Sequence, residues 1–179
     1  VSIGGVMAAK EMYSDLSILY LDAHADFRDE YMGSKFSHAC TARRISEICP
    51  IVEIGVRSAS QEEMNYIKEK NITVYFNDLS LNTTPQSTKD ILDSLSDNVY
   101  VSIDLDVLDP SIMPAVGTPE PGGMSWDGIC DLMREVGSKR KIVGFDLMEL
   151  CPPAGPPSCA FVAAKLAYKL MGYATSLEK

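Results

Sequence analysis

The sequence has little positive charge and few histidines. Its 179 residues include 16 lysines and arginines, 25 aspartates and glutamates and two histidines, for a formal net charge of −9. A chain this negative repels phosphate backbones and anionic lipid, so nucleic-acid binding and membrane binding are disfavoured. A small cationic ligand suits this charge better.

Long apolar runs and paired cysteines are also absent from the sequence. No apolar run approaches the ~20 residues that span a bilayer, and no basic-then-apolar segment of the signal-peptide type opens the chain. The cysteines are odd in number, widely spaced and without a CxxC pair: Cys40, Cys49, Cys130, Cys151 and Cys159. This pattern disfavours a disulfide framework or a zinc site and favours a reducing compartment. We therefore expect a cytoplasmic protein.

Short β-prone runs alternate with segments of helical period along the chain. Strands are predicted at residues 18–21, 51–56, 73–76, 99–105 and 142–147, and helices at 37–48, from 60 onward, and at 88–95, 125–136 and 158–171. This alternation predicts right-handed crossovers and a three-layer α/β/α fold with a mostly parallel sheet. Without an internal repeat or a linker, residues 1–179 are interpreted as one domain.

The beginning of the sequence lies within an apolar run. Residues 1–5 (VSIGG) predict the tail of a strand followed by a turn. Because a domain seldom begins within a strand, we expect that the N-terminal part of the domain is missing from this sequence.

Acidic clusters follow two of the predicted strands. Asp22, His24 and Asp26 have the spacing i, i+2, i+4, which places them on one side of extended backbone, and Asp104 and Asp106 form a second such pair. Parallel strands present their carboxyl ends at one edge, where ligands bind. Four carboxylates and an imidazole gathered there would repel each other without a cation. Oxygen-rich ligands with imidazole favour a pair of Mn²⁺ ions.

Each motif also has an ordinary structural explanation. An isolated DxD at a strand end is most often a solvated turn or a helix cap, whereas DxHxD is rarer. Both motifs in one chain favour the metal site. Both histidines, His24 and His38, follow the same predicted strand.

Four stretches together resemble the ureohydrolases, the family of arginases and agmatinases. They are DAHAD at 22–26, SIDLDVLDP at 102–110, GTPEPGG at 117–123 and GFDLMELCPP at 144–153. The resemblance extends over nearly the whole chain in the family's order and implies an arginase-like fold. GTPEPGG and the segment SHACTARR at 37–44 are most similar to the agmatinase branch.

The resemblance implies a role for each metal-ligand candidate. Asp22 and Asp104 would bridge two Mn²⁺ ions. Asp26 would complete the more buried ion, and His24 and Asp106 would bind the other. Members of the family form homo-oligomers, so a trimer or hexamer is expected.

The resemblance also implies the catalytic residues. His38 would shuttle protons and contact substrate, Glu149 would hold the guanidinium group, and Asp26 would stabilise the intermediate. Without the resemblance, His38 would be interpreted as a surface residue and Glu149 as a solvated loop acid. Asp109 is expected to tie the metal loop by hydrogen bonds.

The implied reaction is attack of a metal-bridging hydroxide on a guanidinium carbon, releasing urea and an amine. Agmatine, a cation whose hydrolysis gives putrescine for polyamine biosynthesis, is the expected substrate. Three alternatives remain open: an arginase, another guanidino-acid hydrolase, or a non-catalytic subunit with the same fold.

Two features depart from the family's pattern. Members have a further metal-binding histidine in a Gly-Gly-Asp/Glu-His-Ser turn, but here Gly4-Gly5 is followed by Val6-Met7. Either the ligand has been lost, or residues that belong between Gly5 and Val6 are absent; the second explanation predicts an interrupted chain there. Many members also place Tyr-Asp where this chain has Ala154-Gly155.

Overall fold

A five-stranded parallel sheet forms the centre of the molecule. The computed structural model describes residues 1–76 and 85–175. The strands are β1 (Ser17–Leu21), β2 (Ile51–Val56), β3 (Thr73–Phe76), β4 (Asn98–Asp104) and β5 (Lys141–Met148). They are arranged in the order β3-β2-β1-β4-β5, and each pairs with its neighbours in parallel.

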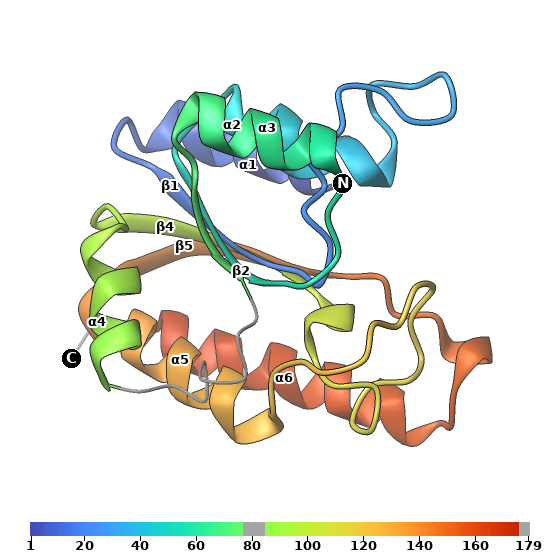
Figure 1. Cartoon of the computed structure of the whole chain (residues 1–179). Coiled ribbons are helices and arrows are strands. Elements are labelled where there is room, and N and C mark those ends of the chain that lie inside the picture. Colours follow the sequence, from blue (N-terminus) through green and yellow to red (C-terminus); the bar gives the residue numbers. More distant parts are fainter. Residues whose placement is uncertain (77–84, 176–179) are drawn as a thin grey trace.

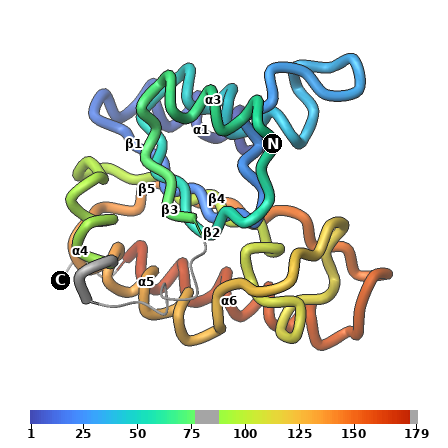
Figure 2. The backbone as a smooth tube through the Cα atoms, viewed as in Figure 1, coloured from blue at the N-terminus to red at the C-terminus, as the bar shows by residue number. Residues whose placement is uncertain are grey.

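Helices cover both faces of this sheet (Figure 1). One layer contains α1 (Ser2–Met12), α2 (Thr41–Ser46) and α3 (Gln61–Lys70), and the other contains α4 (Pro85–Asp93), α5 (Trp126–Lys139) and α6 (Ser158–Ala174). Short 3₁₀ turns are η1 (His38–Cys40), η2 (Leu105–Val107) and η3 (Pro152–Ala154). The backbone trace follows the same three layers (Figure 2). The predicted α/β/α fold is therefore confirmed.

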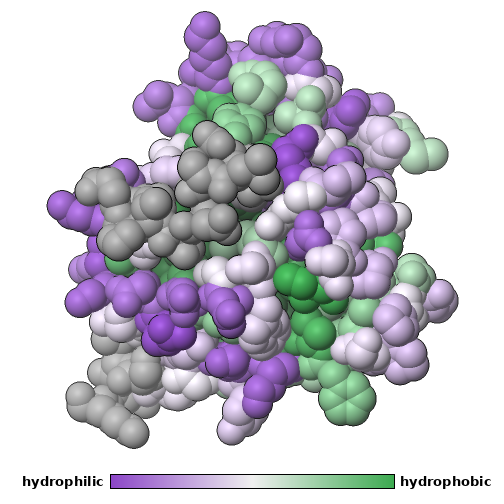
Figure 3. Space-filling model, turned by 60° about the horizontal axis from the view of Figure 1, so that its bottom comes forward, coloured by the Kyte–Doolittle hydropathy of each residue, from purple (hydrophilic) through white to green (hydrophobic). Residues whose placement is uncertain are grey.

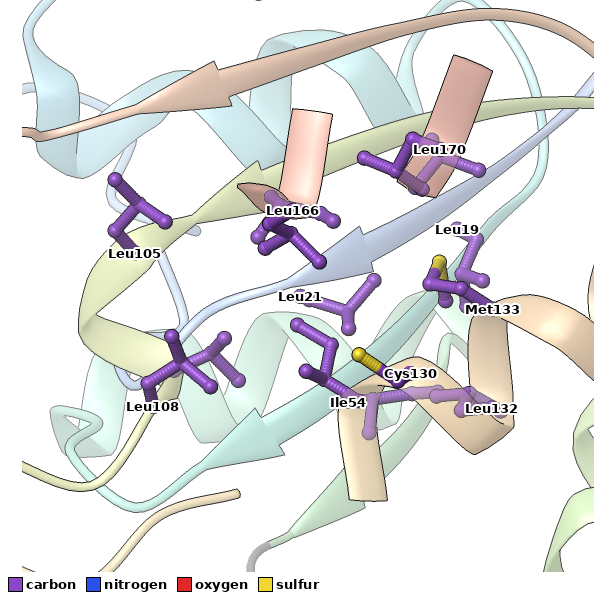
Figure 4. Packing of buried hydrophobic residues seen from close by; sticks show 14 of the residues in the cluster. Leu19, Leu21, Ile54, Leu105, Leu108, Cys130, Leu132, Met133, Leu166 and Leu170 are labelled. Atoms are coloured by element: carbon purple, nitrogen blue, oxygen red, sulfur yellow. The ribbon is translucent and has the colours of Figure 1, made fainter. Parts of the chain in front are cut away.

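The central strand β1 is buried on both faces, so its alternate side chains enter different cores. Ile18 and Tyr20 pack in the cluster beneath α1–α3, whereas Leu19 and Leu21 belong to the cluster against α5 and α6. In Figure 4 the sheet residues Leu19, Leu21 and Ile54 lie near side chains of the helices, namely Cys130, Leu132, Met133, Leu166 and Leu170. Both cores hold β1 in place, and β1 leads directly into the DAHAD segment.

The N-terminal residues differ from the sequence prediction. Val1–Gly5 is not the tail of a strand, because residues 2–12 form helix α1. Gly4 and Gly5 lie inside this helix and donate their backbone N–H groups to the carbonyl of Val1, so they form no loop turn. Gly5 has no Cβ and therefore allows α1 to approach the Tyr100 hydroxyl closely.

Helix α1 continues through Gly5 and Val6, where the sequence predicts an interrupted chain. The expectation that the natural protein has further residues at this junction stays a prediction. That residues 1–179 form one incomplete domain also stays a prediction.

The surface formed on the side of α5 and α6 is mostly hydrophilic and is interrupted by a hydrophobic area (Figure 3). Exposed large apolar side chains on α6 include Phe161 and Tyr168. No helix within the described residues is both long enough and apolar enough to cross a membrane.

A fully buried carboxyl group lies in the middle of β2. Glu53 pairs with Tyr20 in the sheet register and is 0% exposed. Among the described residues, none gives a hydrogen bond to either of its carboxyl oxygens. Burial raises the pKa of Glu53, and the nearby carboxyl groups of Asp22, Asp26 and Glu63 raise it further. The folded state therefore retains a proton on Glu53 that the unfolded chain releases above about pH 4.3.

Replacing Glu53 by Met, an unbranched apolar residue, should stabilise the protein. Because the pKa of Glu53 is raised in the folded state, its contribution to the free energy of unfolding declines as pH rises from about 4.3 toward the folded pKa. The stabilisation from Glu53→Met is therefore larger at pH 8 than at pH 5. We expect the free energy of unfolding to increase by about 1–3 kcal/mol at pH 8. Urea denaturation in EDTA measures the free energy of unfolding, with the exposed Glu69→Met variant as control. A Glu53→Met protein less stable than the wild type at pH 8 would contradict the prediction.

Candidate metal and active site

Three neighbouring strands deliver the candidate residues to one edge of the sheet. Leu21 of β1 pairs with Ile103 of β4, so the next residue of each strand, Asp22 and Asp104, lie side by side at the carboxyl edge. Asp104 in turn pairs with Met148 of β5, which directly precedes Glu149. Parallel pairing in register therefore gathers acids that are far apart in the sequence.

A cavity of about 560 Å³ opens at this edge. Every candidate residue from the sequence lies in its wall: Asp22, His24, Asp26, His38, Asp104, Asp106 and Glu149. Arg28, Tyr31 and Glu63, which the sequence analysis did not single out, also line it. The structure thus brings the candidates together, while the role of each remains a prediction.

Asp22, His24 and Asp106 form the tightest group. One ligand atom from each lies within 4.8 Å of the others. The Nδ1 atom of His24 is 2.9 Å from Oδ2 of Asp106 and 3.6 Å from Oδ1 of Asp22. Two carboxylate oxygens and an imidazole nitrogen converging in this way make a donor set for a divalent cation. Asp26 and Asp104 are not part of this group but line the same cavity.

The carboxylates are fixed by backbone N–H groups of the two loops that carry them. Oδ1 of Asp22 accepts the His24 N–H at 2.7 Å, and Oδ1 of Asp104 accepts the Asp106 N–H at 3.0 Å. Oδ1 of Asp106 accepts the Ala23 N–H at 3.0 Å, which joins the two loops. These bonds leave the second oxygen of each carboxylate for another partner.

Burial and mutual repulsion make the acids difficult to ionise together. Burial raises the pKa of Asp22 to about 7, and burial together with the charges of Asp22 and Asp106 raises the pKa of Asp104 to about 10. Burial and the charge of Asp22 also raise the pKa of Asp26. A cation in the cavity would remove this penalty, so the donor set fits a metal ion on electrostatic grounds.

His24 and Asp106 behave as an ion pair within this acidic cluster. Hydrogen bonds with Asp106 and Asp22 raise the pKa of His24 to about 10. Burial opposes ionisation of Asp106, but hydrogen bonds from His24 and the Ala23 N–H outweigh it and hold the pKa of Asp106 below its usual value. The imidazolium therefore supplies the positive charge that a metal ion would otherwise supply, and metal binding must displace its proton.

Two candidate residues have an unusual backbone conformation. Asp26 and Glu149 have positive φ angles of 52° and 64°, which is uncommon for residues other than glycine. Such conformations cost of order 1 kcal/mol and cluster at functional sites. The Tyr20 hydroxyl donates to Oδ2 of Asp26 at 3.3 Å, and a Cβ at Gly117 would lie 3.4 Å from Oε2 of Glu149. Tyr20 thus holds Asp26, and the absence of a side chain at Gly117 leaves space beside the Glu149 carboxylate.

His38 lies at the start of η1, on an exposed part of the cavity wall. Its ring packs edge-on against Tyr31 with a centroid separation of 5.5 Å, and its Nδ1 atom is 3.5 Å from the Ser37 hydroxyl. Asp109 accepts the Ser111 N–H at 2.9 Å and is not part of the cavity wall, in agreement with a role in loop structure.

Glu63 is a buried residue whose contacts the sequence analysis missed. It completes a capping box with Ser60 at the beginning of α3 and also accepts the Phe27 N–H at 3.0 Å. The Ser-x-x-Glu spacing signals the cap. Its contact with the residue after Asp26 depends on tertiary packing and has no sequence signal.

Comparisons with known proteins agree with this geometry. Residues 1–172 match the Arginase family. The chain is 39% identical over 175 residues to an N(1)-aminopropylagmatine ureohydrolase of Synechocystis sp., covering 97% of this chain and 57% of that protein. It is 39% identical over 158 residues to an agmatinase of Pyrococcus horikoshii, covering 87% of this chain and 54% of that protein.

The fold is similar to solved structures of the same kind. A crystal structure of a putative agmatinase from Clostridium difficile superimposes with a TM-score of 0.89 at 31% identity, covering 100% of this chain and 65% of that chain. This chain therefore spans well under two thirds of the length of the curated relatives named above. The match over residues 1–172, together with the shared fold, shows that the chain belongs to the arginase family of ureohydrolases.

Proposed function

We propose that this protein is an agmatinase-like ureohydrolase that releases urea from a cationic guanidino compound, using two Mn²⁺ ions. The observation that carries the proposal is the convergence of Asp22, His24 and Asp106 in an acid-lined cavity. His24 and Asp106 would serve one ion, Asp26 would serve the other, and Asp22 and Asp104 would serve both. When bound, such a metal pair lowers the pKa of shared water toward about 7 and so supplies hydroxide at neutral pH.

Residues on the cavity wall would bind and orient the substrate. The carboxylate of Glu149 neutralises the guanidinium group and aligns its carbon, which converts an encounter into a reactive geometry. His38, on the exposed wall, donates the proton that the departing amine needs. Asp26, which is partly buried and accepts a hydrogen bond from the Tyr20 hydroxyl, would stabilise the reacting group.

The charge of the chain and the names of its relatives support a choice of substrate. Curated relatives are named agmatinase or N(1)-aminopropylagmatine ureohydrolase, and both names denote substrates with a guanidinium group and a cationic tail. A chain of net charge −9 attracts such compounds. Agmatine and N(1)-aminopropylagmatine are therefore the proposed substrates, with a role in polyamine biosynthesis. A cytoplasmic location and a homo-oligomer remain predictions.

Asp106→Asn should abolish tight Mn²⁺ binding and urea release together, because it removes a charged oxygen from the three-residue group. The measurements are metal content after Mn²⁺ loading and urea release from agmatine, N(1)-aminopropylagmatine, arginine and guanidinobutyrate. The exposed Asp131→Asn serves as the matched control. A wild-type protein that binds Mn²⁺ yet is inactive on all four compounds would favour a non-catalytic role and contradict the proposal.

His38→Ala should lower kcat by about 100-fold, the usual contribution of a general acid, while leaving Mn²⁺ affinity unchanged. Added imidazole should restore part of the activity, because the exposed position of His38 leaves space for a small proton donor. Steady-state kinetics with and without imidazole measure the loss of kcat and its partial recovery. An unchanged kcat would exclude His38 from proton transfer.

Glu149→Gln should reduce kcat/KM by about 100-fold or more, because the guanidinium group loses the carboxylate countercharge on the cavity wall. Glutamine keeps the size of the side chain, so metal content should stay at the wild-type level. Kinetics with agmatine, combined with elemental analysis, separate the two effects. Loss of metal in this variant would instead identify Glu149 as part of the metal site.

A further inference from the structure

The imidazole of His24 lies between two different sets of carboxylates. Its Nδ1 atom faces Asp106 and Asp22, at 2.9 and 3.6 Å. Its Nε2 atom faces the other way and lies 3.7 Å from Oε1 of Glu120, in the GTPEPGG loop. The ring is only partly buried, with 25% of the His24 side chain and 36% of the Glu120 side chain exposed. The first set forms the candidate metal group, and Glu120 lies on the opposite side of the ring.

Arg57, the residue after β2, connects the segments that carry these groups. Its guanidinium donates to the backbone carbonyls of Asp106 at 2.7 Å and Glu120 at 3.0 Å, and also to that of Pro121 at 3.2 Å. Its own backbone N–H donates to the carbonyl of Ala23 at 2.9 Å, next to His24. A planar guanidinium with five N–H groups is suited to hold several carbonyls at fixed angles.

Arg57 is therefore bonded to each segment whose position matters to the His24 ring. The DAHAD segment meets Arg57 through its backbone N–H, and the Asp106 turn and the Glu120 loop meet its guanidinium group. A surface glutamate near a histidine is usually worth little on its own. Here the backbone of Glu120 is fixed relative to that of Asp106, which sets where its carboxylate can lie.

We propose that Glu120 is a positioning residue for His24, and that Arg57 sets its place. A metal-binding imidazole normally donates its second ring N–H to a carboxylate, which fixes the ring orientation and makes the coordinating nitrogen a better donor. The Glu120 carboxylate lies 3.7 Å from Nε2, within ion-pair distance though longer than a hydrogen bond, and its charge on that side directs Nδ1 to the metal group. This inference rests on the metal site of the proposed function but concerns residues outside the metal-ligand set.

Mn²⁺ affinity of Glu120 variants tests the proposal. Glu120→Ala should bind Mn²⁺ about 10-fold more weakly than wild type, the lower end of the range for an outer carboxylate partner. Glu120→Gln retains an acceptor oxygen and should lose less. The thermal unfolding temperature of Glu120→Ala in EDTA should equal that of the wild type. A purely structural role for Glu120 would instead lower this temperature in the absence of metal. The exposed Glu135→Gln is the matched control.

The nitrogen that coordinates metal gives a second measurement. The protein has only two histidines, so ¹⁵N imidazole spectra of a Zn²⁺-loaded sample resolve His24 directly. We expect coordination through Nδ1 in the wild type and a mixture of Nδ1 and Nε2 in Glu120→Ala. Coordination through Nε2 in the wild type would overturn the proposal.

A double-mutant cycle tests the part assigned to Arg57. Arg57→Lys cannot contact all of these carbonyls and should weaken Mn²⁺ binding, and Glu120→Ala should then add little further loss. Fully additive losses would show that Arg57 does not act through Glu120. A wild-type protein that binds no Mn²⁺ overturns the proposed function itself, whereas wild-type binding with unchanged affinity in Glu120→Ala overturns this inference alone.

Discussion

Parallel pairing of β1 with β4 brings the carboxyl groups of Asp22 and Asp104 together at one buried edge of the sheet. Repulsion between these groups is the constraint on which the rest of the site depends. Without a cation, burial and repulsion raise the pKa values of Asp22 and Asp104, and Asp106 pairs with His24. A divalent ion would replace both the bound protons and the charge of His24. Relief of this repulsion would therefore favour the binding of a divalent ion.

The supporting residues show how this edge is held in shape. Glu63 joins the beginning of α3 to Phe27, and Arg57 joins the end of β2 to the Asp106 turn and the Glu120 loop. Asp26 and Glu149 keep positive φ angles within this frame. Strain of this kind persists only where surrounding bonds determine the backbone, so the rigid sheet and its caps allow loops to carry precise chemistry.

The regular part of the fold was predictable because it follows from local periodicity. Runs such as 18–21 and 99–105 are β-prone over their whole length, and the strands observed there differ by only a few residues. Residues 1–5 were predicted wrongly as the tail of a strand, because valine, isoleucine and paired glycines have low helix propensity. Their helix forms through packing, as the close approach of Gly5 to Tyr100 illustrates. Tertiary contact overrode local preference there.

The sequence by itself determined the alternating α/β pattern and the carboxylate-rich motifs at strand ends, because both depend on spacing along one strand. Only the tertiary structure decided that Asp22, His24 and Asp106 form the tight group while Asp26 and Asp104 lie beside it. It also decided that Arg57, Glu63 and Glu120 surround the site. Their contacts join segments as far apart in the sequence as His24 and Glu120. Such contacts depend on strand order and register, which local spacing does not encode.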